Sequence, residues 1–394
     1  MKLRYPKYYE KFSCIAGQCE DTCCAGWEID IDDKTYEYYM QLPGKMGDRI
    51  RDSIKEYQLD DDDVYESHGF ILQEGMRCPF LNENNLCDII LELGEQAICD
   101  VCTYTPRNFL EYGQAREISI SPSCAEAGRL IFGSSQKVEI VEREVDENLS
   151  FEESEEELQV AQAIRQARDG AIDILQNREM AIEHRICDFI LYAKQIQEYL
   201  NQNDFSKIAQ ARDAWEQSVE GTLPLEKGSV DLHSYFKRRM ESFGGLDSIN
   251  EEWEHTLERL RLLFLEAGGK ERYEKTFWRF RTYVREKNRE YEWEQLMVYQ
   301  AFLLLARAVD GLNFWGKAQL CVSSFLMIQD MALERFYQNG ESFLVEDMVD
   351  IVRVYAKEVE HSQENLEFLE EEFLFEEIYR LEALCAQIMP DVVC

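Results

Sequence analysis

The sequence predicts a mainly α protein, in which an irregular, cysteine-rich, metal-binding N-terminal module precedes an all-α helical domain. Nine of the 13 cysteines lie within the first 124 residues. The same region holds five of the seven prolines, and its apolar periodicity is short. From about residue 156 onwards apolar residues recur at helical spacing, and no proline interrupts residues 225–389.

The 394 residues are enough for two to three domains. We expect a cysteine-rich domain over residues 1–133, a linker over 134–155 and an all-helical domain over 156–394, which is the expected substrate-binding region. Residues 138–145 read as a short strand, and residues 146–157 are acidic and poorly periodic. The acidic run at 59–63 predicts a solvated loop or the start of a helix.

Apolar stripes predict about eight to ten helices between residues 156 and 387. One stripe, which starts at Leu257 and ends at Ala267, precedes two glycines that supply a C-terminal stop. Another runs from Leu344 to Val359, and Ser342 is its expected N-cap. No repeat of fixed period is present, which argues against a solenoid.

The chain is strongly acidic, with 78 acidic and 42 basic residues and a formal net charge of −36. This charge repels phosphate backbones, so we expect no nucleic-acid partner. It favours a cationic or lysine-bearing partner, or it only keeps the protein in solution. Residues 1–13 lack the apolar core of a signal peptide, and no run reaches the ~18 apolar residues of a membrane span. We therefore expect a cytoplasmic protein with no membrane partner.

Clustered thiols in a reducing compartment indicate metal binding or redox chemistry rather than disulfides. Thiolates bind zinc or the irons of an iron–sulfur cluster, and the spacing leaves both metals open because only Cys99 and Cys102 form a Cys-x2-Cys pair. The metal is either catalytic or only stabilises a small domain. Adjacent cysteines 23 and 24 have diverging side chains, so they can serve different centres, or one can bind while the other reacts. The remaining cysteines are isolated and expected to be inert: Cys187, Cys321, Cys385 and Cys394.

Three segments resemble the YkgJ-type zinc- or iron-chelating domain: CEDTCCAGW at 19–27, RCPFL with a cysteine six residues later at 77–87, and a Cys-x3-Pro-Arg run at 102–107. The segments SISPSCAEAGRL at 119–130 and EHSQENL at 360–366 are similar to the flagellin lysine-N-methylase (FliB) family. This resemblance implies an S-adenosylmethionine-dependent lysine N-methyltransferase that acts on flagellin and holds a [4Fe–4S] cluster. The metal ligands it implies are Cys14, Cys19, Cys23, Cys24, Cys78, Cys87, Cys102 and Cys124.

Two departures limit what the resemblance implies about mechanism. Cys19-x3-Cys23 begins like a radical S-adenosylmethionine motif, but Gly26 stands where the third cysteine would be. No glycine-rich turn follows a strand, so a Rossmann-type cofactor site is unsupported. We name no catalytic or cofactor-binding residue, and Cys99 lies outside the matched motif. The alternatives are a non-catalytic zinc- or iron-binding module and a redox or electron-transfer protein.

Overall fold

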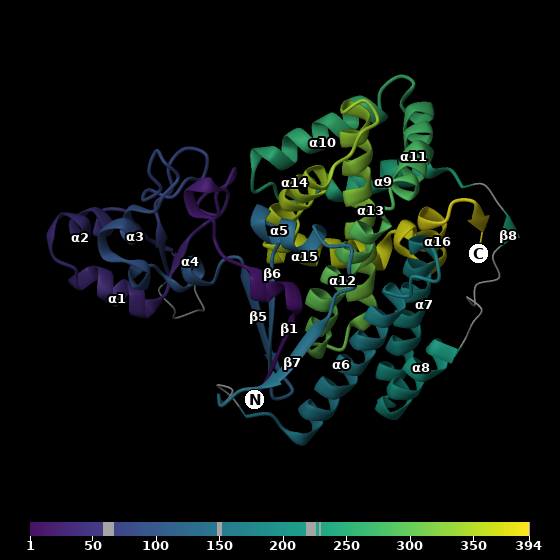
Figure 1. The fold of residues 1–394 in the computed structure, drawn as a ribbon, viewed down its shortest axis with the longest axis horizontal. Coiled ribbons are helices and arrows are strands. Elements are labelled where there is room, and N and C mark those ends of the chain that lie inside the picture. Colours follow the sequence, from purple (N-terminus) through teal and green to yellow (C-terminus); the bar gives the residue numbers. More distant parts are fainter. Residues whose placement is uncertain (58–66, 148–151, 218–225, 228–229, 394) are drawn as a thin grey trace. The chain divides into compact units, whose positions relative to one another are not determined.

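The computed structural model describes residues 1–57, 67–147, 152–217, 226–227 and 230–393. These residues form sixteen α-helices and a few short strands (Figure 1), which confirms the mainly α prediction. The acidic run at 59–63, predicted as a solvated loop or helix start, lies outside the described residues.

Contacts divide the chain into two compact units that interleave in sequence. The small unit comprises Phe12–Asn108 and Ile120–Ala127, and the large unit comprises Met1–Lys11, Phe109–Ser119 and Gly128–Cys394. The linear boundaries at residues 133 and 155 stay predictions.

The small unit combines short helices with a three-stranded antiparallel sheet. Its strands are β2 (Asp30–Ile31), β4 (Ser67–Phe70) and β3 (Ile54–Tyr57), in that order. Its helices are α1 (Asp33–Gln41), α2 (Gly44–Arg51), α3 (Asp88–Leu93) and α4 (Asp100–Tyr104). Asp32 caps α1 by accepting a hydrogen bond from the Thr35 N–H at 2.9 Å. Buried Tyr39, Ile50 and Phe80 form the core of the unit, together with several cysteines.

A four-stranded sheet begins the large unit, in the order β5 (Arg107–Tyr112), β6 (Ala115–Ile120), β1 (Lys2–Pro6), β7 (Ile140–Glu144). β1 pairs in parallel with β6 and antiparallel with β7. Gly113 and Gln114 connect β5 to β6 as a two-residue hairpin turn. Both have positive φ, as such a turn requires. Of these strands, the sequence predicted only β7.

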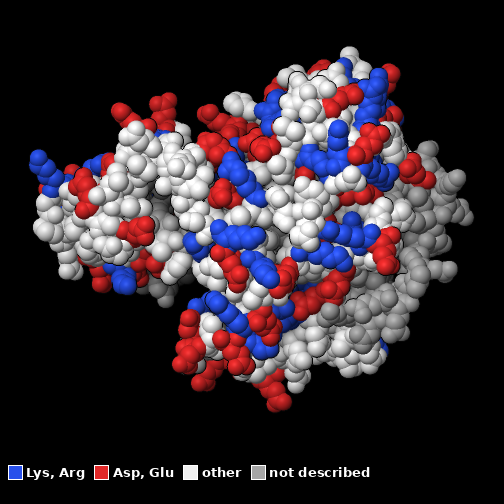
Figure 2. All heavy atoms as spheres, in the orientation of Figure 1, with Lys and Arg blue, Asp and Glu red and all other residues white. Residues whose placement is uncertain are grey.

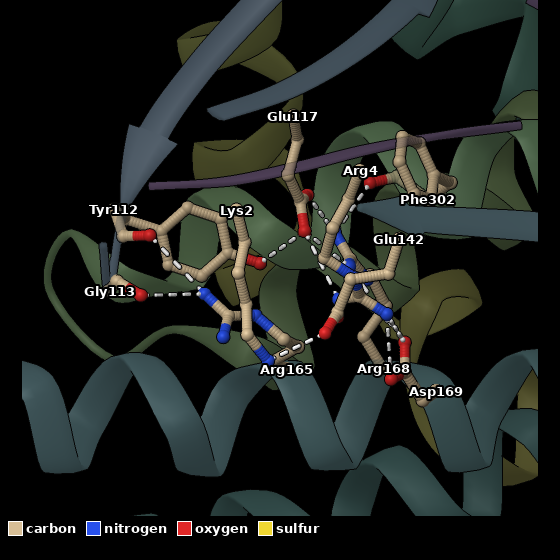
Figure 3. Close-up of polar contacts among 10 residues, drawn as sticks. All are labelled: Lys2, Arg4, Tyr112, Gly113, Glu117, Glu142, Arg165, Arg168, Asp169 and Phe302. Carbon is tan, nitrogen blue, oxygen red and sulfur yellow. Dashed lines mark hydrogen bonds and ion pairs between the residues drawn. The ribbon is translucent and has the colours of Figure 1, made fainter. Parts of the chain in front are cut away.

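Buried ion pairs join this sheet to helix α6 (Glu155–Leu175) (Figure 3). The Glu117 carboxylate on β6 accepts hydrogen bonds from Arg168 on α6, from Arg4 on β1 at 3.2 Å and from the Tyr112 hydroxyl at 3.0 Å. Arg4 also pairs with Asp169 at 2.9 Å. Glu117 and Arg168 are 3% and 0% exposed, so each charge depends on its partner.

The rest of the large unit is helical, and its two central helices are buried on nearly all sides. Twelve of the 15 residues of α12 are buried, as expected for a helix without a polar face. The other long central helix, α13, packs against α7, α12 and α14. The bounds are α7 (Ile182–Asn201), α8 (Phe205–Gln217), α9 (Leu232–Phe243), α10 (Glu251–Phe264), α11 (Gly269–Glu286), α12 (Glu290–Leu304), α13 (Phe314–Gln338), α14 (Val345–Tyr355), α15 (Gln363–Phe375) and α16 (Leu381–Ile388).

Shorter elements complete the described chain. A fifth helix, α5 (Ala125–Phe132), follows Cys124, and strands β8 (Glu226–Lys227) and β9 (Val392–Val393) pair with each other. The 3-10 turns are Lys7–Lys11, Ala16–Gln18, Glu95–Ala97, Leu305–Val309 and Glu377–Tyr379, and Ala356–Glu360 forms a π-helical turn.

Two details of the helical prediction are wrong. The described chain from α6 onwards has eleven α-helices rather than eight to ten. The N-cap of α14 is Leu344 rather than Ser342, because the Leu344 N–H bonds to the Asp347 carboxylate at 2.7 Å and so begins the helix two residues later. The predicted stripe itself is confirmed, since α14 and the π-helical turn bury Met348, Tyr355 and Val359. Among the described residues, no helix is both long and apolar enough to span a bilayer.

Candidate metal centre

Five of the cysteines share the apolar core of the small unit. Cys78 and Cys99 are 6% and 1% exposed, and three partly buried cysteines pack against the same core. We call this set the inner thiol group: Cys24, Cys78, Cys87, Cys99 and Cys102. None of the described cysteines forms a disulfide.

Backbone contacts bring the inner thiols together from distant parts of the sequence. The Cys78 N–H donates to the Cys24 carbonyl at 2.8 Å, and an isolated bridge pairs Leu81 with Cys87. Cys99 is the N-cap of α4 and Cys102 lies in its first turn, which places both on one face of the helix. Their sulfurs are 3.4 Å apart and share a hydrogen bond. Cys99, which the motif omits, therefore lies in the centre of the group.

Burial raises the pKa of two of these thiols, whereas backbone amides at the helix starts lower it. Burial raises the pKa of Cys78 to about 11, although backbone N–H groups of Phe80 and Leu81 lower it. Burial also raises the pKa of Cys87, against the amides of Ile89 and Ile90. Cys87 is the N-cap of α3, so its sulfur is near the positive end of the helix dipole. A metal cation would offset the burial penalty by stabilising the thiolates.

A second set lies near the start of α5, and we call it the outer thiol group: Cys19, Cys23 and Cys124. Burial raises the pKa of Cys124 to about 11, while the amides of Glu126 and Ala127 lower it. Cys19 and Cys23 lie near enough for their negative charge to raise this pKa further. Cys23 is exposed and Cys19 is half-buried, unlike the centre of the inner group.

Gly26 has a structural role that explains the missing third cysteine of the motif. Its φ of +96° lies in the left-handed region, which glycine enters without strain. The Gly26 N–H donates to the Met76 carbonyl at 3.2 Å, and Trp27 donates to the Cys23 carbonyl at 3.0 Å. These bonds close the turn behind the paired cysteines.

The ninth N-terminal cysteine, Cys14, lies outside the described apolar core that holds the inner thiol group. It is exposed, and its sulfur accepts a hydrogen bond from the Ala16 N–H at 3.4 Å. All other predicted ligands fall in the inner or the outer group.

The donor set fits a thiophilic metal. Sulfurs of a tetrahedral zinc–thiolate site are roughly 3.8 Å apart, given Zn–S bonds of about 2.3 Å, and the Cys99–Cys102 separation of 3.4 Å is close to this. Thiolates and helix amides also suit an iron–sulfur cluster. Over the part of the chain that is described, no three donors already stand at metal-ligand geometry. The ligand roles therefore stay predictions.

Two carboxylates of the π-helical turn, buried Glu358 and half-buried Glu360, form a separate acid–base feature of the large unit. Burial raises the pKa of Glu360 to about 7, against hydrogen bonds at 2.7 Å from the Tyr299 hydroxyl and the Gln300 amide. Burial likewise raises the pKa of Glu358 to about 7. π-Helical turns are frequent at functional sites. A carboxylate of this kind can accept or release a proton at neutral pH. The sequence showed Glu360 only as the start of a motif, because its burial depends on α12.

The small unit is thus a thiol-rich module. The large unit is a helical domain, and sequence comparison relates it to the helical domain of lysine N-methylases. The model of the FliB lysine N-methylase C-terminal domain matches residues 168–387, more than half of the chain. This chain belongs to the FliB lysine N-methylase family. The YkgJ-type resemblance of the N-terminal part stays a prediction.

Curated relatives come from Salmonella. A lysine-N-methylase of Salmonella typhimurium (strain LT2) is 25% identical over 142 residues, which cover 36% of this chain and 35% of that protein. A flagellar biosynthetic protein FliU of Salmonella muenchen is 27% identical over 139 residues, covering 35% of this chain and 81% of FliU. The match thus spans about a third of the lysine-N-methylase. No solved structure matches.

Proposed function

We propose that this protein is a lysine N-methyltransferase that modifies flagellin, with S-adenosylmethionine as methyl donor and a cysteine-bound iron–sulfur cluster. Membership of the FliB lysine N-methylase family carries this proposal. The names of the Salmonella relatives support it, since they join lysine methylation to flagellar biosynthesis. The inner and outer thiol groups support the cluster, because together they hold eight free cysteine thiols of the kind that bind iron–sulfur clusters.

The reaction would transfer a methyl group from the sulfonium of the donor to the lysine nitrogen. The carbon–sulfur bond breaks, the carbon–nitrogen bond forms, and a proton leaves the amine. The amine must be neutral, because an ammonium group has no lone pair. A base with a pKa near 7 meets this requirement, and Glu360 is one such group. When bound, the cluster would supply redox or Lewis-acid chemistry to the donor.

The charge of the protein suits a lysine-bearing partner. The net charge of −36 attracts cationic surfaces. On the face drawn in Figure 2, acidic and basic side chains are interspersed over the described helices, so no single acidic field covers it. We therefore expect lysines to be recognised by local carboxylates, with the net charge acting mainly on the rate of encounter.

The proposed function is tested with anaerobically purified protein, flagellin and methyl-labelled S-adenosylmethionine. We expect label on lysine ε-nitrogens of flagellin, located by peptide mass spectrometry. Flagellin whose lysines have been acetylated is the matched control, and it should take up no label. Absence of label on unmodified flagellin, with the metal content of the enzyme intact, would contradict the proposal.

A further inference from the structure

The large unit contains a cavity of about 240 Å³ that is lined by residues of α10, α13 and α14. These helices pack against one another (Figure 1) and lie within residues 168–387, which match the family model. The buried part of the lining consists of Met331, Ile351, Val354, Thr256 and Glu334. The other lining residues are polar or charged and are exposed or half-buried, so the cavity has an apolar interior and a charged rim.

Glu334 is a buried carboxylate of this lining that lacks a hydrogen-bond donor. The residue is 3% exposed, and among the described residues its buried Oε1 atom has no hydrogen-bond partner. The Nε atom of Arg259 lies 3.3 Å from this oxygen and forms an ion pair with it, but not an aligned hydrogen bond. A carboxylate that is removed from water is costly unless donors surround it. The cavity therefore requires a donor at Glu334.

The other acidic and arginine side chains of the lining are held by ion pairs with hydrogen bonds. Arg335 donates to Asp350 at 2.8 Å. Arg353, from behind the rim, donates to Glu252 at 2.8 Å and to Asp350 at 2.9 Å. The requirement of the cavity is thus for a cationic donor that meets the buried carboxylate, and not for an anion that meets an arginine.

We propose that this cavity receives a lysine side chain of the protein substrate. The lysine ammonium donates to the Glu334 carboxylate, and its methylene stem packs on Met331, Ile351 and Val354. The inference deepens the proposed function and rests on it for the protein that carries the lysine. The assignment of an ammonium to the cavity rests on the geometry of the lining.

Size and shape select lysine among the candidate ligands. Pockets for drug-sized ligands measure about 300–1,000 Å³, so a cavity of about 240 Å³ suits a single side chain better than the whole of S-adenosylmethionine. An ammonium is compact and has three donors, whereas the planar fork of an arginine ligand would meet the guanidinium of Arg259. The stem of a lysine side chain also packs well along apolar surface.

The first experiment measures binding of Nα-acetyl-lysinamide to the full-length protein by saturation-transfer NMR, without a methyl donor. Nα-acetyl-norleucinamide has the same stem without the ammonium, and Nα-acetyl-argininamide has a guanidinium in its place. We expect saturation transfer to the lysine probe and little to the other two. Absence of binding by the lysine probe, or equal binding by the norleucine probe, would overturn the proposal.

Two variants then locate the binding. Glu334→Gln keeps the shape of the side chain and should weaken binding of the lysine probe about 10- to 100-fold, because the bond to a charged group is lost. Its matched control is Glu258→Gln, an exposed acid of α10 outside the cavity lining. Val354→Phe fills the cavity without changing a charge and should abolish binding, whereas Leu344→Phe, at the exposed start of α14, should not.

Circular dichroism shows which variants fold, and Val354→Phe decides the matter if Glu334→Gln does not. Wild-type affinity in either folded cavity variant would overturn the proposal. The methylation assay separates this outcome from failure of the proposed function. Lysine binding in the cavity without methylation of flagellin contradicts only the proposed function. Methylation of flagellin with wild-type kcat and KM in both cavity variants contradicts only the assignment of the cavity.

Discussion

Glu360 is a residue whose protonation is set by its surroundings. Burial raises its pKa from 4.5 to about 7, against the hydrogen bonds from Tyr299 and Gln300. The folded state therefore binds more protons than the unfolded state between these values. Consequently, this group lowers the free energy of unfolding as pH rises from about 4.5 to 7, and its contribution is constant above that.

The Glu360→Gln substitution should remove this pH dependence, because an amide does not titrate and keeps similar bonding atoms. We expect the variant to gain stability relative to wild type as pH rises, by about 1–3 kcal/mol at pH 8. Urea unfolding at pH 5 and pH 8 measures the gain. The exposed Glu367→Gln variant should show no such trend. If the difference in unfolding free energy between wild type and Glu360→Gln were the same at pH 5 and pH 8, the argument would be refuted.

At the scale of single residues, the sequence predicted the candidate site only in part. Spacing and motif selected eight cysteines, of which seven fall into the two thiol groups. Cys99 was left out because it lies outside the matched family motif, yet the turn of α4 places its sulfur beside Cys102. Cys14 has the right residue type, but it is exposed and its sulfur bonds to the nearby Ala16 N–H, and spacing along the chain does not reveal this.

At the scale of secondary-structure elements, the packing of β6 against α6 depends on one carboxylate, that of Glu117. Glu117 lies between the guanidinium groups of Arg4 and Arg168, and all three side chains are buried (Figure 3). Removing its charge leaves two buried cations without their main partner. This is far more costly than breaking an exposed pair.

The Glu117→Gln substitution should lower the free energy of unfolding of the large unit by about 3–5 kcal/mol. Loss of helical circular dichroism in urea reports the change. Glu139→Gln, which breaks the exposed pair with Lys7, is the matched control and should leave the urea midpoint unchanged. If both variants unfolded at the wild-type midpoint, the network would have no role in stability.

Helices were predictable from sequence because their apolar spacing is local, and the stripe over α14 is an example. The four-stranded sheet was not, because β1 pairs with segments more than 110 residues away and pairing partners leave no local pattern. Helix ends also escaped prediction: the stripe that ends at Ala267 belongs to a helix that ends at Phe264.

For the whole molecule, two units with separate cores predict two unfolding transitions. The small unit has many thiols in its core, so metal binding to its folded state should stabilise it selectively. We expect metal removal to lower the thermal midpoint of the small unit and leave that of the large unit unchanged. Differential scanning calorimetry of metal-loaded and stripped protein checks this. A single transition that shifts as a whole would contradict it.

The position of β1 has a consequence for biosynthesis. Lys2–Pro6 is made before its neighbour Ile140–Glu144, which leaves the ribosome about 140 residues later. At 5–20 residues per second this delay is on the order of 10 s. All nine N-terminal cysteines are synthesised in that interval, so any metal that the small unit binds can be acquired before the sheet of the large unit closes. The order of translation would thereby favour metal loading ahead of final assembly.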